Sequence, residues 1–221
     1  MSVPLTVRDL LDDDSGPIPI RHPSRVAPPS LAAPPAGRVD LDAAERAAEA
    51  FLHALGIPTD SESLRRTPRR MAMAYAELFS PTEFEPTTFP NDEGYDELVL
   101  ARAIPMRTVC EHHMLPFSGV AHVGYLPGDR VLGLSKLARA VQHFAARPQM
   151  QERLTKQVAD WLHDVLAPRG VGVVIEAEDS CMVLRGVAAR GSSTVTSSMQ
   201  GLLRTDPRCR QEFLALTGLT H

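Results

Sequence analysis

Apolar residues recur at helical spacing in two segments of the N-terminal half of the chain. Between residues 41 and 55 they follow one another at intervals of three and four, and Gly56 fits the end of a helix. Further on, Thr67 and Pro68 fit the N-cap and the first position of a second helix. Its apolar face would consist of Met71, Tyr75, Leu78 and Phe79. The pattern predicts two amphipathic helices in succession.

The charge at the start of the second predicted helix is unusual. Arg69 and Arg70 would stand in its first turn, where positive charge opposes the helix dipole. Arginines that cost stability there can be kept to bind an anion, although an exposed arginine with no ligand is the commoner case.

After a proline-rich link at residues 81–90, the pattern changes to strands. Residues 96–110 predict a strand that leads into a cluster of Cys and His residues. Residues 120–126 predict its hairpin partner, closed by the turn at 127–129.

Two longer helices and more strands are expected in the rest of the chain. Ser135 fits the cap of the first helix, Pro148 fits the start of the second, and residues 168–170 end it. Three strands and a short final helix follow, at 171–177, 181–187, about 193–199 and 207 to about 216. The order of strands, two long helices and strands favours a sheet with helices on one face, which is an α+β domain.

The first 38 residues differ from the rest in composition. They hold eight of the 19 prolines and the acidic run Asp12-Asp13-Asp14. Such a segment cannot bury enough apolar surface to offset the entropy lost on ordering, so we expect a disordered tail. The predicted division is therefore a tail at 1–38, an N-terminal helical region at 39–90 and a main domain at 91–221.

Charge and hydropathy argue against several classes of protein. The net charge is −4 and the sequence pI is about 6.1, so bulk charge does not indicate nucleic-acid binding. No stretch approaches the roughly 18 apolar residues of a membrane span, and the N-terminus lacks the apolar core of a signal peptide. Three cysteines without a pattern fit a reducing compartment. We expect a cytoplasmic protein without membrane or nucleic-acid partners.

Candidate chemistry gathers in the run Cys110-Glu111-His112-His113. Cys110 and His113 are three apart, so a turn or a strand end can aim both at one ion, whereas His112 would point elsewhere. A zinc ion with three protein ligands keeps a fourth position for water, which can ionise near neutral pH. The signal is moderately specific, because a lone Cys is usually a small buried hydrophobe.

Two cysteines are candidates for a third ligand. Cys181 follows the apolar run at 171–177, so a sheet could bring it beside Cys110, and we prefer it. Cys209 lies among charges at a predicted helix start, and it is the only cysteine that could add a fourth ligand to a structural site.

Several longer motifs resemble those of the GTP cyclohydrolase I family. They are Cys-Glu-His-His at 110–113, Gly-Leu-Ser-Lys-Leu-Ala-Arg at 133–139, Arg-Pro-Gln-Met-Gln-Glu-Arg-Leu-Thr at 147–155, Cys-Met-Val-Leu-Arg-Gly-Val at 181–187 and Thr-Val-Thr-Ser at 194–197. The resemblance covers about residues 41–218, and several long motifs in the right order are highly specific.

The resemblance implies a fold, an assembly and a reaction. The fold would be the tunnelling fold, with the main domain at 91–221 as its catalytic domain, in which strand pairs flank two antiparallel helices. Two stacked five-membered rings would form a homodecamer with active sites between subunits. The enzyme would convert GTP and water into formate and 7,8-dihydroneopterin triphosphate, the entry to tetrahydrofolate and other pterins.

The resemblance also implies the metal site and the chemistry beside it. Cys110, His113 and Cys181 would hold Zn²⁺, which favours Cys181 over Cys209. His112 would protonate the imidazole nitrogen of the purine, because a histidine side chain ordinarily exchanges protons near neutral pH.

The remaining implied roles concern the nucleotide. Glu152 would accept the N1 and N2 hydrogens of guanine, assisted by the backbone around Gln151, and Ser135 would touch the ribose. Four basic residues would bind the triphosphate, with the first reaching it from a neighbouring subunit: Arg70, Lys136, Arg139 and Arg185.

One position departs from the family pattern. Two residues before the third metal ligand the family typically has His, a second acid or base, and this chain has Asp179. An aspartate with a pKa near 3.9 is a poor acid at pH 7, and losing a positioned acid costs about 10² to 10⁴ in rate. Alternatives to the complete reaction are a paralogue that stops at the ring-opened formamide, one that serves a deazapurine pathway, or a non-catalytic GTP-binding subunit.

Overall fold

The structure is a computed structural model that describes residues 39–219, so the predicted tail at 1–38 lies outside the described residues. The helices are α1 (Leu41–Ala54), α2 (Thr67–Leu78), α3 (Ser135–Ala145), α4 (Gln151–Leu166), α5 (Ser180–Val183), α6 (Leu202–Thr205) and α7 (Pro207–Thr217). The strands are β1 (Thr88–Pro90), β2 (Val99–Cys110), β3 (Pro116–Leu126), β4 (Arg130–Leu132), β5 (Pro148–Gln149), β6 (Gly170–Asp179) and β7 (Thr194–Gly201). None of the helices within 39–219 is long and apolar enough to cross a membrane.

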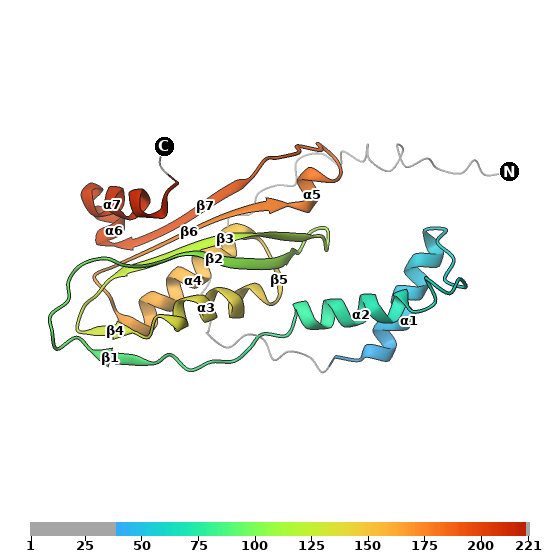
Figure 1. The fold of residues 1–221 in the computed structure, drawn as a ribbon, viewed down its shortest axis with the longest axis horizontal. Coiled ribbons are helices and arrows are strands. Elements are labelled where there is room, and N and C mark those ends of the chain that lie inside the picture. The colour runs from blue at the N-terminus through green and yellow to red at the C-terminus, as the bar shows by residue number, and fades with distance from the viewer. Residues whose placement is uncertain (1–38, 220–221) are drawn as a thin grey trace, which may run out of the picture. The chain divides into compact units, whose positions relative to one another are not determined.

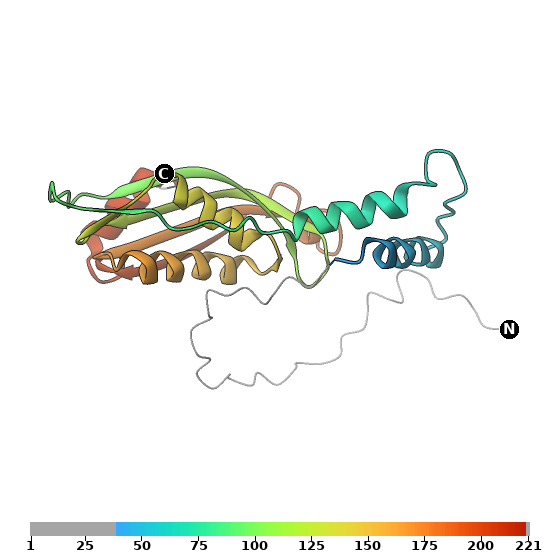
Figure 2. The ribbon, with the colours of Figure 1, turned by 90° about the horizontal axis from the view of Figure 1, so that it is seen from below.

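A five-stranded sheet in the order β5-β2-β3-β6-β7 forms the centre of the fold (Figure 1). Its neighbours from β2 to β7 are antiparallel, and β5 joins β2 in parallel at one end, where Cys110 pairs with Gln149. Strands β1 and β4 form a separate two-stranded sheet. The predicted α+β order, with two consecutive antiparallel helices between pairs of strands, is confirmed (Figure 2).

Both faces of the sheet are buried along β6, because alternate side chains enter two separate cores. Val173 and Ile175 pack in the larger core with α3 and α4, whereas Val174 packs with Phe213 of α7. Full burial of such a side chain contributes about 1.5 to 3 kcal/mol. Gly172 leaves room for the Phe213 ring, whose atoms lie 3.0 Å from where a Cβ would stand. The prediction of helices on one face is therefore wrong, since α6 and α7 cover part of the second face (Figure 1).

Three predicted helix starts are wrong. Arg66 holds the cap position of α2, so Thr67 is already helical, and the cap of α3 is Leu134 rather than Ser135. Neither helix has a side-chain cap, so the Ser135 hydroxyl is not used for capping. Pro148 lies in β5, and α4 starts at Gln151, because pairing with the end of β2 holds residues 148 and 149 extended.

Two strand predictions also fail for reasons of pairing. The β2–β3 hairpin is closed by residues 111–115, and the turn at 127–129 leads instead to β4. The predicted strand at 181–187 is the short helix α5 followed by a turn. Its apolar residues suggested burial, yet Leu184 and Val187 are both 75% exposed. The chain leaves the sheet there because Asp179 pairs with Phe117, almost at the start of β3, and few partner residues remain beyond it.

Candidate active site

The end of the sheet near Cys110 gathers two thiols and an imidazole. Cys110 is the last residue of β2, His113 lies in the hairpin turn that follows, and Cys181 lies on α5 just after β6. Because β2 and β6 lie on either side of β3 and both run antiparallel to it, their C-terminal ends lie at the same end of the sheet. The three candidate ligand atoms all lie within 4.8 Å of one another. Cys209 lies on α7, in the second core.

The chemistry and spacing of this cluster fit a metal ion. Tetrahedral ligands about 2.0 to 2.3 Å from one ion lie roughly 3.3 to 3.8 Å apart, and the Cys110 Sγ to His113 Nδ1 distance is 3.8 Å. Burial raises the pKa of the Cys181 thiol, and the neighbouring Cys110 raises it further. A bound cation reverses this effect because it stabilises thiolates. These three residues could therefore hold a metal ion.

His112 lies close to the Cys110 thiol without joining the candidate ligands. Its Nδ1 is 3.8 Å from Cys110 Sγ, the same distance as His113 Nδ1, but the residues whose ligand atoms all lie within 4.8 Å of one another are Cys110, His113 and Cys181. This agrees with the prediction that Cys110 and His113, and not His112, are aimed at one ion. The tight turn, closed by the Met114 amide donating to the Cys110 carbonyl, folds both rings back over the sulfur. The His112 side chain is 60% exposed, and its Nε2 lies 4.0 Å from the Glu111 carboxylate.

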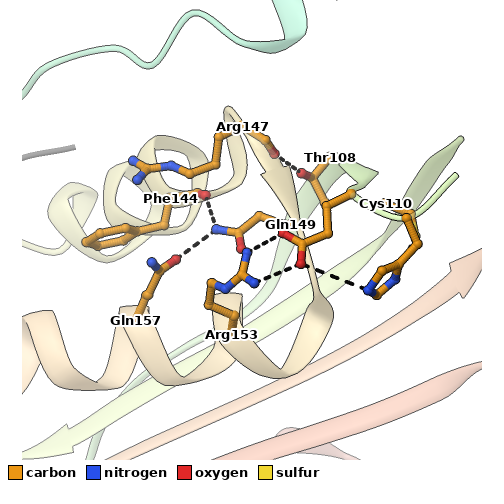
Figure 3. A network of polar contacts seen from close by, with 9 residues as sticks. Thr108, Cys110, Phe144, Arg147, Gln149, Arg153 and Gln157 are labelled. Carbon is orange, nitrogen blue, oxygen red and sulfur yellow. Dashed lines mark hydrogen bonds and ion pairs between the residues drawn. The ribbon is translucent and has the colours of Figure 1, made fainter. Parts of the chain in front are cut away.

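A network of hydrogen bonds connects the turn at residues 111–115 to β5 and α4. Arg153 of α4 donates through both terminal nitrogens to the Glu111 carboxylate, one of them at 2.8 Å. The Glu111 amide donates to the Gln149 carbonyl at 3.0 Å. Gln149 in turn donates to the Phe144 carbonyl and to Gln157, as Figure 3 shows. The turn is thus fixed to β5 through its backbone and to the start of α4 through a side chain.

Asp179 lies two residues before Cys181 and close to Glu152. Burial raises the pKa of Asp179, a hydrogen bond from Thr194 opposes the shift, and the nearby Glu152 carboxylate adds to it. Glu152 itself is exposed in the first turn of α4.

Gln151 uses its side chain within the chain. Its Nε2 donates to the carbonyls of Ile175 in β6 and Thr194 in β7, at 3.0 and 2.9 Å. The side chain therefore ties α4 to two strands.

The other expected phosphate and ribose ligands lie at the opposite end of the sheet. The Leu132 amide donates to the Tyr125 hydroxyl, and Ser135 begins α3 three residues later. Tyr125 is nine residues along β3 from Pro116, or about 30 Å of strand from the metal end. Ser135, Lys136 and Arg139 lie on this half of α3, and within 39–219 their side chains form no hydrogen bond or ion pair with another residue.

The two arginines at the start of α2 differ in their contacts. Arg69 pairs with Asp42 and Glu45 of α1 at 2.8 and 3.1 Å, which explains its position structurally. Arg70 is exposed, and its side chain contacts no partner among the described residues. Arg185 is exposed too, four residues after Cys181 in the turn at the metal end.

Sequence reasoning missed the Glu111–Arg153 pair. Both residues belong to motifs that were recognised, but they are 42 positions apart and no local pattern links them. It also missed a cavity of about 790 Å³ between the end of α2, strands β2 and β3 and the end of α3. None of the predicted site residues lines that cavity.

Comparisons with known proteins agree with the motifs. The family model described as GTP cyclohydrolase I matches residues 44–218. The chain is 51% identical over 182 residues to GTP cyclohydrolase 1 of Mycobacterium tuberculosis (strain ATCC 25618 / H37Rv), covering 80% of this chain and 90% of the relative. It is 45% identical over 178 residues to GTP cyclohydrolase 1 of Aquifex aeolicus (strain VF5), covering 80% and 97%. A crystal structure of the archaeosine synthase QueF-Like in the apo form matches with a TM-score of 0.39 and 16% identity. The match covers 48% of this chain and 94% of that chain, and its TM-score is too low to support a family or a function.

Proposed function

Since the chain belongs to the GTP cyclohydrolase I family, we propose that it converts GTP and water into formate and 7,8-dihydroneopterin triphosphate. The observation that carries the proposal is the convergence of the candidate ligand atoms of Cys110, His113 and Cys181 at one end of the sheet. Hydrolysis at C8 of guanine requires a set of metal ligands together with a carboxylate that binds the purine. The reaction supplies the first pterin intermediate of tetrahydrofolate synthesis.

Zinc is the metal that best fits this ligand set. Two thiolates and one imidazole are among its usual ligands, and three protein ligands leave one position open. When bound, zinc would supply Lewis-acid activation of the water used to open the imidazole ring. A reducing cytoplasm would keep the two thiols available for it.

The chain's own residues would bind guanine and move protons. Glu152 accepts hydrogen bonds from N1 and N2 of guanine, a donor pair that adenine lacks, and so orients C8 toward the metal triad. His112, exposed and next to Cys110, donates a proton to the imidazole nitrogen as the ring opens. Asp179, close enough to Glu152 for that carboxylate to raise its pKa, serves as the second proton-handling group or as a hydrogen-bond acceptor for the ribose.

A second copy of the chain would complete the site. Ser135, Lys136 and Arg139 lie too far along the sheet to reach phosphates of a nucleotide whose purine is at Cys110 of the same chain. Among the described residues, β2 before Val109 and β7 also lack a strand partner on their outer sides, so neighbouring copies can extend the sheet. The family homodecamer places such copies side by side, with Arg70, Lys136 and Arg139 supplied to a neighbour's metal centre.

Product analysis tests the proposed function. Full-length protein loaded with zinc is incubated with GTP, formate is quantified, and the nucleotide product is identified by mass. We expect one formate per GTP and dihydroneopterin triphosphate, with activity lost after chelation and restored by zinc. Accumulation of GTP plus one water would identify an enzyme that stops at the ring-opened formamide. GTP left unchanged by protein with a full complement of zinc would overturn the proposal.

A further inference from the structure

Three consecutive residues in the first turn of α4 act on three different parts of the site. Gln151 binds carbonyls of β6 and β7, the Glu152 carboxylate is close enough to Asp179 at the end of β6 to raise its pKa, and Arg153 binds Glu111 in the metal turn. Because a helical turn is internally rigid, fixing one of these residues also fixes its neighbours. The position of Glu152 relative to the metal turn is therefore set by Gln151 on one side and Arg153 on the other.

The contact between Arg153 and Glu111 has the geometry of an orienting interaction. The guanidinium meets the carboxylate with both terminal nitrogens, an arrangement that fixes direction as well as distance (Figure 3 shows Arg153 beside the turn). The two side chains are 42% and 28% exposed, so the pair adds little to the stability of the fold. Glu111 is also held through its amide by the Gln149 carbonyl. The pair therefore orients two segments that the backbone already brings together.

We propose that the Glu111–Arg153 pair is a specificity-determining positioning device, which sets the distance between the metal turn and Glu152. The inference rests on the proposed function of Glu152 as the guanine reader. Neither Glu111 nor Arg153 needs to touch the nucleotide for this role. If the pair is broken, the turn and the start of α4 shift relative to each other, and Glu152 no longer meets N1 and N2 while C8 faces the metal.

This role predicts a particular substrate dependence. Inosine triphosphate keeps the N1 hydrogen of GTP but lacks the 2-amino group, so it forgoes one of the two hydrogen bonds to Glu152. A hydrogen bond to a charged group contributes about 1.5 to 3 kcal/mol, or roughly 10- to 150-fold in preference for GTP. A misplaced Glu152 loses that bond, so breaking the pair lowers kcat/KM for GTP more than for inosine triphosphate.

The test compares Glu111→Gln, Arg153→Gln and Arg153→Lys in the full-length zinc-loaded protein. Lys156→Gln is the matched control, because Lys156 pairs with Asp160 on the same helix, away from the site. The kinetic constants for both nucleotides are measured together with zinc content. Binding of both nucleotides to chelator-treated protein gives a second readout that does not depend on turnover.

We expect the two Gln variants to keep zinc and to lose roughly 10- to 100-fold in kcat/KM for GTP, with the preference for GTP over inosine triphosphate falling toward unity. Arg153→Lys keeps the charge without the two-pronged contact and retains part of the preference, and Lys156→Gln matches the parent. An equal loss for both nucleotides, an unchanged preference, or activity that falls in step with zinc content would overturn the inference. A parent protein that does not act on GTP would instead refute the proposed function.

Discussion

The two ends of the central sheet differ in how their functional side chains are held. At the Cys110 end, the thiols, imidazoles and carboxylates have partners within the same chain, from the metal triad to the Glu111–Arg153 pair. At the α3 end, Ser135 and Arg139 are exposed and Lys136 is half-buried, and among residues 39–219 none of their side chains forms a hydrogen bond or ion pair. One end is built by the fold of a single chain, and the other is available to a ligand held by a different chain.

The difference follows from what each end has to do. A metal ligand set must be positioned to within a fraction of an ångström, which strand ends and a short turn in one chain can provide. Phosphates are bound by charge and tolerate longer, more flexible side chains, so a neighbouring subunit can supply them. Substitutions at the two ends should therefore differ in whether they affect metal content.

The largest expected effect is at the metal end. Cys181→Ala removes one of three ligands and is expected to abolish tight zinc binding and to lower kcat by about 10³-fold or more, because several kcal/mol of transition-state stabilisation depend on the ion. Metal analysis and formate release measure both effects. Cys209→Ala is the control and should keep zinc and activity, since Cys209 packs against the second core. Zinc retained by Cys181→Ala but lost from Cys209→Ala would contradict the assigned ligands.

A smaller effect on kcat is expected from substitution of Asp179, which lies near Cys181 but is not one of the three candidate metal ligands. Asp179→Ala should lower kcat by about 10²-fold while zinc content stays the same, as expected for loss of a proton-handling group. The adjacent Glu178→Ala is the control, because Glu178 is exposed. Equal kcat values for the two variants would show that Asp179 takes no part in the chemistry.

The smallest effect on activity is expected midway between the two ends. His122 is buried in β3, and its pKa is lowered first by burial and then by Arg102, while Glu176 opposes the shift. The unfolded chain binds the proton more readily, so this residue's contribution to stability is full above pH 6.5 and is lost as the pH falls. His122→Val should reduce the drop in melting temperature between pH 7 and pH 5 and leave kcat at pH 7 unchanged. An unaltered pH dependence of melting would contradict this.

Much of the fold was predictable because apolar periodicity reports burial. The helices at 41–55 and 207–216 and the strands at 171–177 and 193–199 were predicted close to their observed bounds. The errors occur where pairing, and not hydropathy, decides the structure. Residues 181–187 are apolar enough for a strand but have no strand beside them. Pro148 fits the first position of a helix, but pairing with β2 keeps it in an extended conformation.

The site was predictable in its residues but not in its geometry. The Cys110, His113 and Cys181 cluster came from motif spacing and resemblance, and the structure brings its ligand atoms together. No sequence pattern could show that Gln151 uses its side chain to tie α4 to β6 and β7, or that Arg153 pairs with Glu111. Both contacts join residues more than 20 positions apart, so they follow only from how the elements pack.

The most direct test of a site shared between two copies is to mix two defective chains. Cys181→Ala lacks the metal end, and the double variant Lys136→Ala with Arg139→Ala lacks the phosphate end, so each alone should retain about 1% of activity or less. Co-expressed in equal amounts with different tags and purified through both, the two chains should regain about a quarter of the parent activity, because one in four neighbouring pairs then combines two intact ends. Mixed assemblies that stay at the level of the separate variants would contradict the account.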